Sequence, residues 1–300
     1  MSRISSWINA ARLRTLPLSI SGILVGSSIA AFEGYFDIAI FSLALGTTLG
    51  LQILSNFAND YGDGVKGTDN EDRIGPARAI QSGLITHKDM KLAMVITASA
   101  TLLLAVLLIY ASFGSEKLLS ALVFFLLGVG AIIAAIKYTV GNTAYGYKGF
   151  GDIFVFVFFG LVSVYGSYYL YSHDHELISI FPAIAIGFLS VAVLNLNNLR
   201  DRISDEKAGK ITLIVKMGDK KGKDYHYFLI LGALFFLLVY SVINSSELND
   251  LIYLFAFIPL FLHLKRVVTN KDSRKLDPEL KVVALSTFAI SLLFALGLIW

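Results

Sequence analysis

Nine long apolar stretches constrain the fold of this chain more than any other feature of its sequence. They cover approximately residues 16–32, 38–58, 90–113, 118–136, 150–171, 177–199, 225–243, 248–264 and 282–300. A helix needs about 20 mostly apolar residues to cross a bilayer. We therefore predict an all-α fold, a polytopic membrane helix bundle of about nine transmembrane helices. The eighth stretch is short and carries Pro259 and His263, so a re-entrant segment is the alternative there.

The basic residues predict how this bundle is oriented. If all nine stretches span the membrane, 24 of the 25 Lys and Arg fall on one side, and Lys117 is the exception. By the positive-inside rule that side is cytoplasmic, which places the amino terminus inside and Trp300 outside. No small-residue cleavage pattern follows the first apolar stretch, so we expect it to be a retained helix and not a signal peptide.

Composition excludes several kinds of site. The chain has no cysteine, which rules out disulfides, thiolate catalysis and cysteine-ligated metals. Its five histidines are scattered, which argues against a histidine-built metal centre. The net charge is only +3, and we expect membrane lipid and no nucleic acid as a partner.

The second apolar stretch runs into an acidic motif, NFANDYGDGVKGTDNEDRIGPARAIQSG. Asp60 and Asp63 are three residues apart, so they share one face if the helix continues that far. We expect Gly62, Gly64 and Gly67 to break the helix, so that the next aspartate can fold back toward the same point. The candidate site residues of this motif are Asn59, Asp60, Asp63, Asp69, Arg73 and Arg78.

The sixth apolar stretch ends in a second motif of similar composition, VLNLNNLRDRISDEKAGKITL. Asn198, Asp201 and Asp205 recur at spacings of three and four residues, which places them along one helical face. Arg200 and Lys210 flank them. Either motif alone could consist of helix caps and solvated loop residues. Two such motifs, in the two long segments expected on the basic side at about 59–89 and 200–224, indicate a function.

Hard oxygen ligands from Asp and Asn, without His or Cys, suit Mg²⁺. Magnesium held by a few carboxylates keeps positions open for substrate phosphate, and the flanking Arg and Lys can donate to the same phosphates. Inside a membrane protein, such a site suits a substrate that is half lipid and half diphosphate, such as a polyprenyl diphosphate. Tyr138 and Tyr147, in the segment YTVGNTAYGYKGFGD, are candidate wall residues, or else part of an interfacial aromatic belt.

These motifs resemble those of the UbiA superfamily of intramembrane aromatic prenyltransferases. The segments NDYGDGVKGTD, DRIGPARAIQSG, YTVGNTAYGYKGFGD and LNNLRDRISDEKAGKITL carry the resemblance, which extends from RLRTLPLS through the ninth stretch. They are most similar to the branch that prenylates 1,4-dihydroxy-2-naphthoate in menaquinone biosynthesis. The resemblance implies one transmembrane prenyltransferase domain over 1–300, in a bacterial inner membrane, with its active site facing the cytoplasm.

The resemblance also implies the reaction and its residues. A polyprenyl diphosphate would be joined to 1,4-dihydroxy-2-naphthoate, with release of diphosphate and CO₂, to form demethylmenaquinol. The residues that correspond to the family's magnesium–diphosphate site are Asn59, Asp60, Asp63, Asp201 and Asp205. The first motif departs from the common superfamily form at Gly67, where Asp69 two residues later can substitute, and Asn198 stands where many relatives have Asp. The diphosphate contacts we expect are Arg73, Arg78, Arg200 and Lys210.

Three other functions share parts of this sequence pattern. A related enzyme with another acceptor, such as 4-hydroxybenzoate or a chlorophyll precursor, is the nearest. A CDP-alcohol phosphotransferase also needs paired aspartate motifs, but DGVKGTD does not match its pattern. A transporter built on a repeat would place its charged site near the membrane midplane, and no apolar stretch has a charged residue at its centre.

Overall fold

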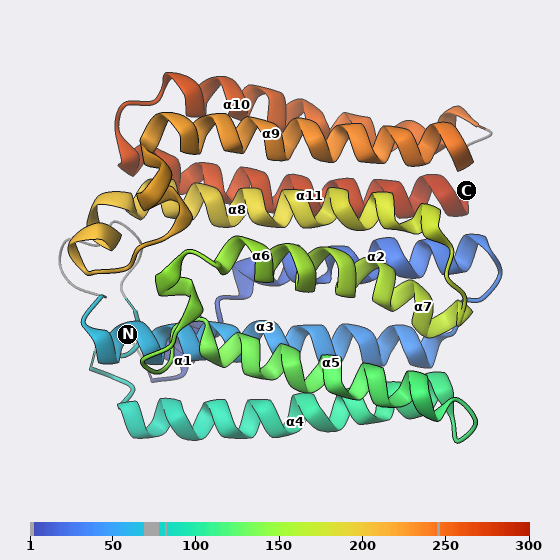
Figure 1. The fold of residues 1–300 in the computed structure, drawn as a ribbon, viewed down its shortest axis with the longest axis horizontal. Helices are drawn as coiled ribbons and strands as arrows, with labels where there is room; N and C mark the ends of the chain where they lie inside the picture. Colours follow the sequence, from blue (N-terminus) through green and yellow to red (C-terminus); the bar gives the residue numbers. More distant parts are fainter. Residues whose placement is uncertain (1–2, 69–77, 82, 245–246) are drawn as a thin grey trace.

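The computed structural model describes residues 3–68, 78–81, 83–244 and 247–300. All regular secondary structure in these ranges is helical, and nine of the helical segments are long and apolar enough to cross a membrane. They run side by side along one axis, with the amino and carboxyl ends at opposite ends of the bundle (Figure 1). The prediction of an all-α membrane bundle is confirmed.

The first four spans are formed mainly by single helices. A short helix α1 (Arg3–Ala11) and the turn η1 (Leu13–Thr15) precede α2 (Leu16–Phe32), and α3 (Ile38–Lys66), α4 (His87–Phe113) and α5 (Leu118–Lys137) follow. The turn η2 (Tyr145–Lys148) then leads into the fifth span, which consists of α6 (Gly151–Val155), the π-helix η3 (Phe156–Gly166) and α7 (Ser167–Ser172).

The remaining spans combine short 3₁₀ turns with long helices. The sixth comprises η4 (Leu177–Ser179) and α8 (Ile180–Lys207), and α9 (Leu213–Asn244) is the seventh. The eighth comprises η5 (Leu248–Phe257) and α10 (Ile258–Thr269), and the ninth comprises η6 (Ser273–Leu276) and α11 (Asp277–Ile299). Pro259 lies in the first turn of α10, where its missing N–H costs nothing. The eighth segment is therefore helical over a full span length, and the re-entrant alternative is not needed.

The four described aspartates of the two motifs, Asp60, Asp63, Asp201 and Asp205, lie in helix and not in loops. Helix α3 continues to Lys66 and α8 to Lys207, beyond the ends at 58 and 199 expected from hydropathy. The prediction that Gly62 and Gly64 break the helix was wrong, because only Gly67, at φ 70°, ends it. Gly62 instead permits close packing: a Cβ there would lie 2.5 Å from Oγ1 of Thr139.

Helix α8 lies at the centre of the bundle. It packs against α9, α11 and η3, and α2 packs against α11 and η3. Much of α8 is buried, including Leu189 and Leu196 at full burial. Helices α4 and α5 lie at the edge of the bundle and turn large apolar side chains outward, as a lipid-facing surface requires (Figure 1). The second acidic motif is thus built on one of the two most enclosed spans among the described residues.

Replacing Gly62 with Ala is expected to destabilise the fold. The new Cβ would also approach the backbone carbonyl carbon of Thr139 to 2.7 Å, and overpacking of this kind costs about 1–3 kcal/mol. Gly130→Ala is the matched control, since a Cβ on this helical glycine meets nothing within 4 Å. We expect the apparent melting temperature in detergent to fall for Gly62→Ala and to hold or rise for Gly130→Ala. Equal melting temperatures would contradict the close contact.

Candidate active site

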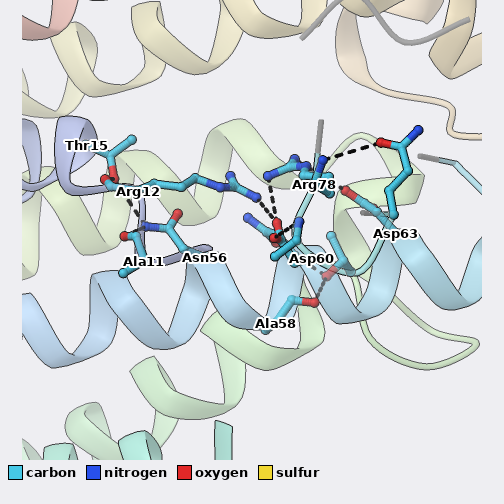
Figure 2. A network of polar contacts seen from close by, with 12 residues as sticks. Ala11, Arg12, Thr15, Asn56, Ala58, Asp60, Asp63 and Arg78 are labelled. Atoms are coloured by element: carbon cyan, nitrogen blue, oxygen red, sulfur yellow. Dashed lines mark hydrogen bonds and ion pairs between the residues drawn. The ribbon is translucent and has the colours of Figure 1, made fainter. Parts of the chain in front are cut away.

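Asp60 is the centre of the first motif, and two arginines converge on it (Figure 2). It is 1% exposed. Its Oδ1 accepts hydrogen bonds from Arg12 at 2.6 Å and from Arg78 at 2.8 Å. Its Oδ2 accepts from the backbone N–H of Ala79 at 3.4 Å. Because a buried carboxylate is stable only when paired, these two arginines are part of the site and not a solvated surface.

Sequence reasoning missed Arg12. It lies between α1 and η1 in the left-handed region, at φ 50° and ψ 58°, which non-glycine residues adopt rarely and at a cost of about 1–3 kcal/mol. The conformation turns the chain so that the side chain reaches α3 across 48 residues of sequence. The basic amino terminus is a visible signal in the sequence, but its charge predicts orientation and does not identify Asp60 as a partner.

Asp63 lies one turn further along α3 and is also buried. Its Oδ1 accepts a hydrogen bond from the Tyr147 hydroxyl at 2.8 Å, and its Oδ2 lies 3.9 Å from Arg78. Burial first, and then the charge of Asp63, raises the pKa of Tyr147 above its ordinary value. Tyr147 therefore stays a neutral donor at physiological pH. It was expected as a wall for the substrate, but the structure places it behind Asp63, and it does not line the cavity described below.

Arg200 organises the second motif. Its guanidinium holds both carboxylate oxygens of Asp201, at 2.8 and 2.5 Å. Its remaining N–H groups donate to Asp277 at the start of α11 and to Asn197 on α8. Arg200 is 3% exposed and Asp201 6%, so the pair is fixed inside the bundle. Asp277 is a second residue that the sequence did not identify, although it lies in a charged segment just before the ninth apolar stretch.

Lys210 pairs with the last aspartate of the second motif, and its Nζ lies 3.3 Å from Oδ1 of Asp205. Burial lowers the pKa of Lys210, but the charges of Asp205 and Asp63 outweigh burial and raise it above the ordinary value. The two motifs are close to one another, since Tyr147 donates to Asp63 and its ring also lies near Lys210. Tyr147 lies between them, with Nζ of Lys66 3.8 Å and Nζ of Lys210 5.8 Å from its ring centroid.

A cavity of about 1150 Å³ opens between the motifs and extends into the bundle. Asn59, Asp60, Asp63, Arg78, Arg200 and Lys210 line its polar part, together with Tyr138. Burial raises the pKa of Tyr138 to about 12, so its phenol is neutral. Asn198, Asp201 and Asp205 do not line the cavity, but Asp201 and Asp205 contact Arg200 and Lys210, which do. Deeper in the bundle the lining is mostly apolar and includes Leu51, Leu108, Phe124, Leu127 and Phe158.

Two buried oxygens of the second motif have no hydrogen-bond partner among the described residues. They are Oδ1 of Asn198 and Oδ2 of Asp205, whose residues lie two helical turns, about 10 Å, apart on α8, so they would bind separate divalent ions and not a single one. Amide and carboxylate oxygens are suitable ligands for such an ion. Within the ranges that the structure covers, no three His, Asp or Glu side chains are gathered as a preformed metal site. Asp69 and Arg73, both expected in the site, lie outside the described residues.

The sequence of this chain matches a known protein family over most of its length. The model of the UbiA prenyltransferase family matches residues 19–298. The chain belongs to the UbiA prenyltransferase family. This UbiA protein is 43% identical over 298 residues to a 1,4-dihydroxy-2-naphthoate octaprenyltransferase of Escherichia coli (strain K12). The aligned region covers 99% of this chain and 96% of the relative. It is 42% identical over 299 residues to the protein of the same name from Haemophilus influenzae, with the same coverage.

The fold agrees with solved UbiA structures. A UbiA homolog from Archaeoglobus fulgidus bound to GPP and Mg²⁺ superposes with a TM-score of 0.69 and covers 98% of this chain and 99% of its own. The same homolog bound to DMAPP and Mg²⁺ gives a TM-score of 0.67. Sequence identity is only 16% and 15%, so these similarities establish the shared UbiA fold. The resemblance to the superfamily stated from the motifs is confirmed.

The Lys210–Asp205 pair is expected to stabilise this UbiA fold. Lys210→Met leaves a buried carboxylate without its cation, which costs about 3–5 kcal/mol. Because the folded-state pKa of Lys210 is raised, its contribution is complete below the unfolded value of about 10.4 and is lost only above it. Burial also raises the pKa of Asp205 to about 6, and loss of Lys210 would raise it further. The difference in melting temperature between wild type and variant should therefore be greatest near pH 9 and should shrink as pH falls toward 6, because the unpaired carboxyl takes up a proton. The control is Lys216→Met, since Lys216 is exposed and donates only to the Lys148 carbonyl.

Proposed function

We propose that this chain is an intramembrane prenyltransferase that joins 1,4-dihydroxy-2-naphthoate to a polyprenyl diphosphate and releases diphosphate and CO₂ to form demethylmenaquinol. One observation carries the proposal: a single cavity has a cation-rich polar part between two acidic motifs and an apolar part inside the bundle. The similarity to two 1,4-dihydroxy-2-naphthoate octaprenyltransferases over 99% of the chain supports the choice of acceptor. The whole chain, 1–300, acts as one catalytic domain in this proposal.

The polar part of the cavity suits a diphosphate because its described lining carries an excess of three positive charges. The cations are Arg12, Arg14, Arg78, Arg200, Lys210 and Lys281, and the acids are Asp60, Asp63 and Asp277. Guanidinium groups hold phosphate oxygens through paired N–H donors. As the allylic C–O bond breaks, Arg78, Arg200 and Lys210 can stabilise the charge that develops on the departing diphosphate.

Magnesium fits the oxygens that remain. In this proposal the ligands come from Asn59, Asp60, Asp63 and Asp69 in the first motif and from Asn198, Asp201 and Asp205 in the second. The oxygens of Asn198 and Asp205 that have no partner among the described residues support each as a ligand, of separate ions because the two residues lie two helical turns apart. Bound Mg²⁺ would add positive charge where the diphosphate leaves. Asp60 and Asp201 are held by arginines in this structure. Asp60 would exchange part of that pairing for the ion, whereas Asp201 would keep Arg200 and offer its remaining lone pairs.

The acceptor reaction requires no dedicated base. The ring carbon that forms the new C–C bond carries the carboxylate, and loss of CO₂ restores aromaticity in place of proton loss. None of the described residues that line the cavity is a histidine, in keeping with this chemistry. Tyr138 lines the cavity as a neutral phenol and packs edge-to-face against Tyr145 at 5.4 Å. Its ring can face the electron-poor allylic carbon, since aromatic faces attract cations.

The charge distribution supports a cytoplasmic active site. The two motifs lie at the end of the bundle where the basic residues gather, and this is the side that the positive-inside rule assigns to the cytoplasm. We assign the protein to the inner membrane of a bacterial cell as a multi-pass protein, since the relatives named above are bacterial.

The reaction is tested with purified protein, Mg²⁺, 1,4-dihydroxy-2-naphthoate and an allylic polyprenyl diphosphate. Diphosphate and CO₂ should be released together in equal amounts. Asp63→Ala and Asp201→Ala should lower the rate by about 100-fold or more, because each removes a carboxylate from the site. Circular dichroism and melting temperature show whether each variant is folded.

Two results would contradict the proposal. Diphosphate release with 4-hydroxybenzoate but not with 1,4-dihydroxy-2-naphthoate would reject the acceptor and favour a related aromatic prenyltransferase. Unchanged turnover in excess chelator would reject the role of magnesium.

The whole cavity is long enough to hold a diphosphate and part of a polyprenyl chain. On α3 its lining runs from Asp60, in the polar part, to Ala44, which is about 24 Å at 1.5 Å per residue, in a hydrocarbon core of about 30 Å. Gly128 on α5 and Gly166 on η3 line it at mid-depth and beyond. A Cβ on Gly128 meets only Ala105, at 3.8 Å, and Ala105 also lines the cavity. Larger side chains at these glycines would take space from the prenyl chain.

Gly128→Leu and Gly166→Leu should therefore discriminate by chain length. We expect activity with a short allylic diphosphate such as geranyl diphosphate to be kept and activity with octaprenyl diphosphate to fall by about tenfold or more, since lost space of this kind costs about 1–3 kcal/mol. Gly130→Leu is the matched control, two residues away on α5 and outside the cavity lining. Equal loss with both substrates would show that the prenyl chain does not lie along these glycines.

A further inference from the structure

Two histidines far apart in sequence meet inside the bundle. Nε2 of His226 on α9 lies 2.7 Å from Nε2 of His263 on α10. On one side, Nδ1 of His226 lies 3.0 Å from Oδ1 of Asn195, whose amide donates to the backbone oxygen of Gly222 at 3.3 Å. On the other side, Nδ1 of His263 lies 2.6 Å from Oε2 of Glu279. Both imidazoles are fully buried, and neither lines the cavity.

The direction of these hydrogen bonds can be worked out from one fixed acceptor. The carbonyl of Gly222 can only accept, so Asn195 turns its NH₂ toward it and its oxygen toward His226. Nδ1 of His226 must then carry a proton. Between the two Nε2 atoms lies one further proton, and a third lies between His263 and the oxygen of Glu279. Two neutral imidazoles and a carboxylate supply only two protons for these three contacts. The hydrogen-bonded series Asn195–His226–His263–Glu279, called the histidine chain below, therefore holds one more proton.

The extra proton belongs on a histidine. Glu279 accepts hydrogen bonds from Arg266 at 2.6 and 2.9 Å, which keeps its carboxylate ionised. An imidazolium beside that carboxylate forms a buried ion pair, whereas an unpaired buried charge would be unstable. Glu279 on α11 and Arg266 on α10 are the charged groups that face the two imidazoles among the described residues. The side chain that α8 presents to the pair is the neutral Asn195.

The histidine chain completes a closed series of contacts among four helices, one of which, α8, carries the second acidic motif. Asn195 on α8 contacts α9, His226 contacts α10, and His263 contacts Glu279 on α11. Two residues before Glu279, Asp277 returns to α8 by accepting from Arg200, which holds Asp201. The first turn of α11 is thus fixed on one side by the histidine chain, and on the other it supports the arginine of the motif.

We propose that the chain Asn195–His226–His263–Glu279 is a positioning device for the second motif and that it stores one proton as a buried imidazolium. His226, His263 and Glu279 are positioning residues, because they act through Asp277 and Arg200 and do not touch the cavity. The stored proton follows from the hydrogen bonds alone. The effect on substrate binding rests on the proposed function as a prenyltransferase.

The proton is tested by ¹⁵N NMR of protein labelled at its five histidines. At pH 8, above the ordinary histidine pKa of about 6.5, one ring should still be protonated at both nitrogens, and His263→Asn and His226→Asn identify the two rings. Glu279→Gln should abolish the doubly protonated ring, since a neutral amide does not pair with an imidazolium. A wild-type spectrum in which every ring has one bare nitrogen overturns the stored proton, whatever the activity of the protein.

The positioning role is tested with the same Glu279→Gln variant by steady-state kinetics. We expect the KM for the polyprenyl diphosphate and the Mg²⁺ concentration for half-maximal rate to rise by about 10–100-fold, as for other groups behind metal ligands, while the KM for the naphthoate changes little. Tyr227→Phe is the matched control: it removes a different α9–α10 hydrogen bond, to the carbonyl of Leu264, and should leave both constants unchanged.

The possible results separate the proposals. A doubly protonated ring together with unchanged constants in Glu279→Gln overturns the positioning role. If Glu279→Gln does not fold, Asp277→Ala replaces it, because it leaves the histidine chain intact and removes the oxygen that accepts from Arg200; unchanged constants there overturn the role equally. Wild-type protein without any prenyl transfer would contradict the proposed function, and the NMR result would still decide the stored proton.

Discussion

The pairing of buried carboxylates with cations is the interaction on which this site depends. Asp60, Asp63, Asp201 and Asp205 are each at most 6% exposed at the end of a membrane bundle. A buried carboxylate without a partner is costly, and removal of one member of a buried pair costs more than the pair contributes. Each of the four therefore has a cation or a strong hydrogen-bond donor. Arg12 joins the segment between α1 and η1 to α3, and Arg200 joins α8 to Asp277 at the start of α11, so the charge pairing also sets how the helices lie at the active end.

The sequence predicted what depends on local pattern. Nine apolar stretches gave nine helical segments of spanning length, since hydropathy alone decides which segments a bilayer can hold. The i, i+3 spacing of the aspartates gave their shared faces. The helix ends were less accurate, because α3 and α8 continue into polar sequence beyond the apolar stretches. Charged residues cannot be recognised as helical from hydropathy when packing and ion pairs stabilise the last turns.

The parts that the sequence did not predict are contacts between distant residues. Arg12 and Asp60 are 48 residues apart, Arg200 and Asp277 are 77 apart, and His226 and His263 are 37 apart. The histidines were scattered in the sequence and gave no sign of meeting, because only the packing of α9 against α10 brings them together. Tyr147 shows a related limit: its type suited a cavity wall, whereas its place behind Asp63 depends on the path of the loop after α5. Residue type and spacing indicate which groups are functional, but partners come from tertiary structure.

The same cations have to serve two states of the site. In this structure Arg12 and Arg78 neutralise Asp60, and Lys210 neutralises Asp205. In the proposed reaction a diphosphate enters with its own counter-ions, so the arginines can turn toward phosphate while the aspartates keep a positive neighbour. No carboxylate is left alone in either state, and the exchange does not require burying a new net charge. Arg200 is the exception. It is held on three sides by Asp201, Asn197 and Asp277, and one of these contacts comes from a helix that the histidine chain fixes in place. The first motif is therefore suited to exchanging its partners, and the second to keeping its geometry while the first does so.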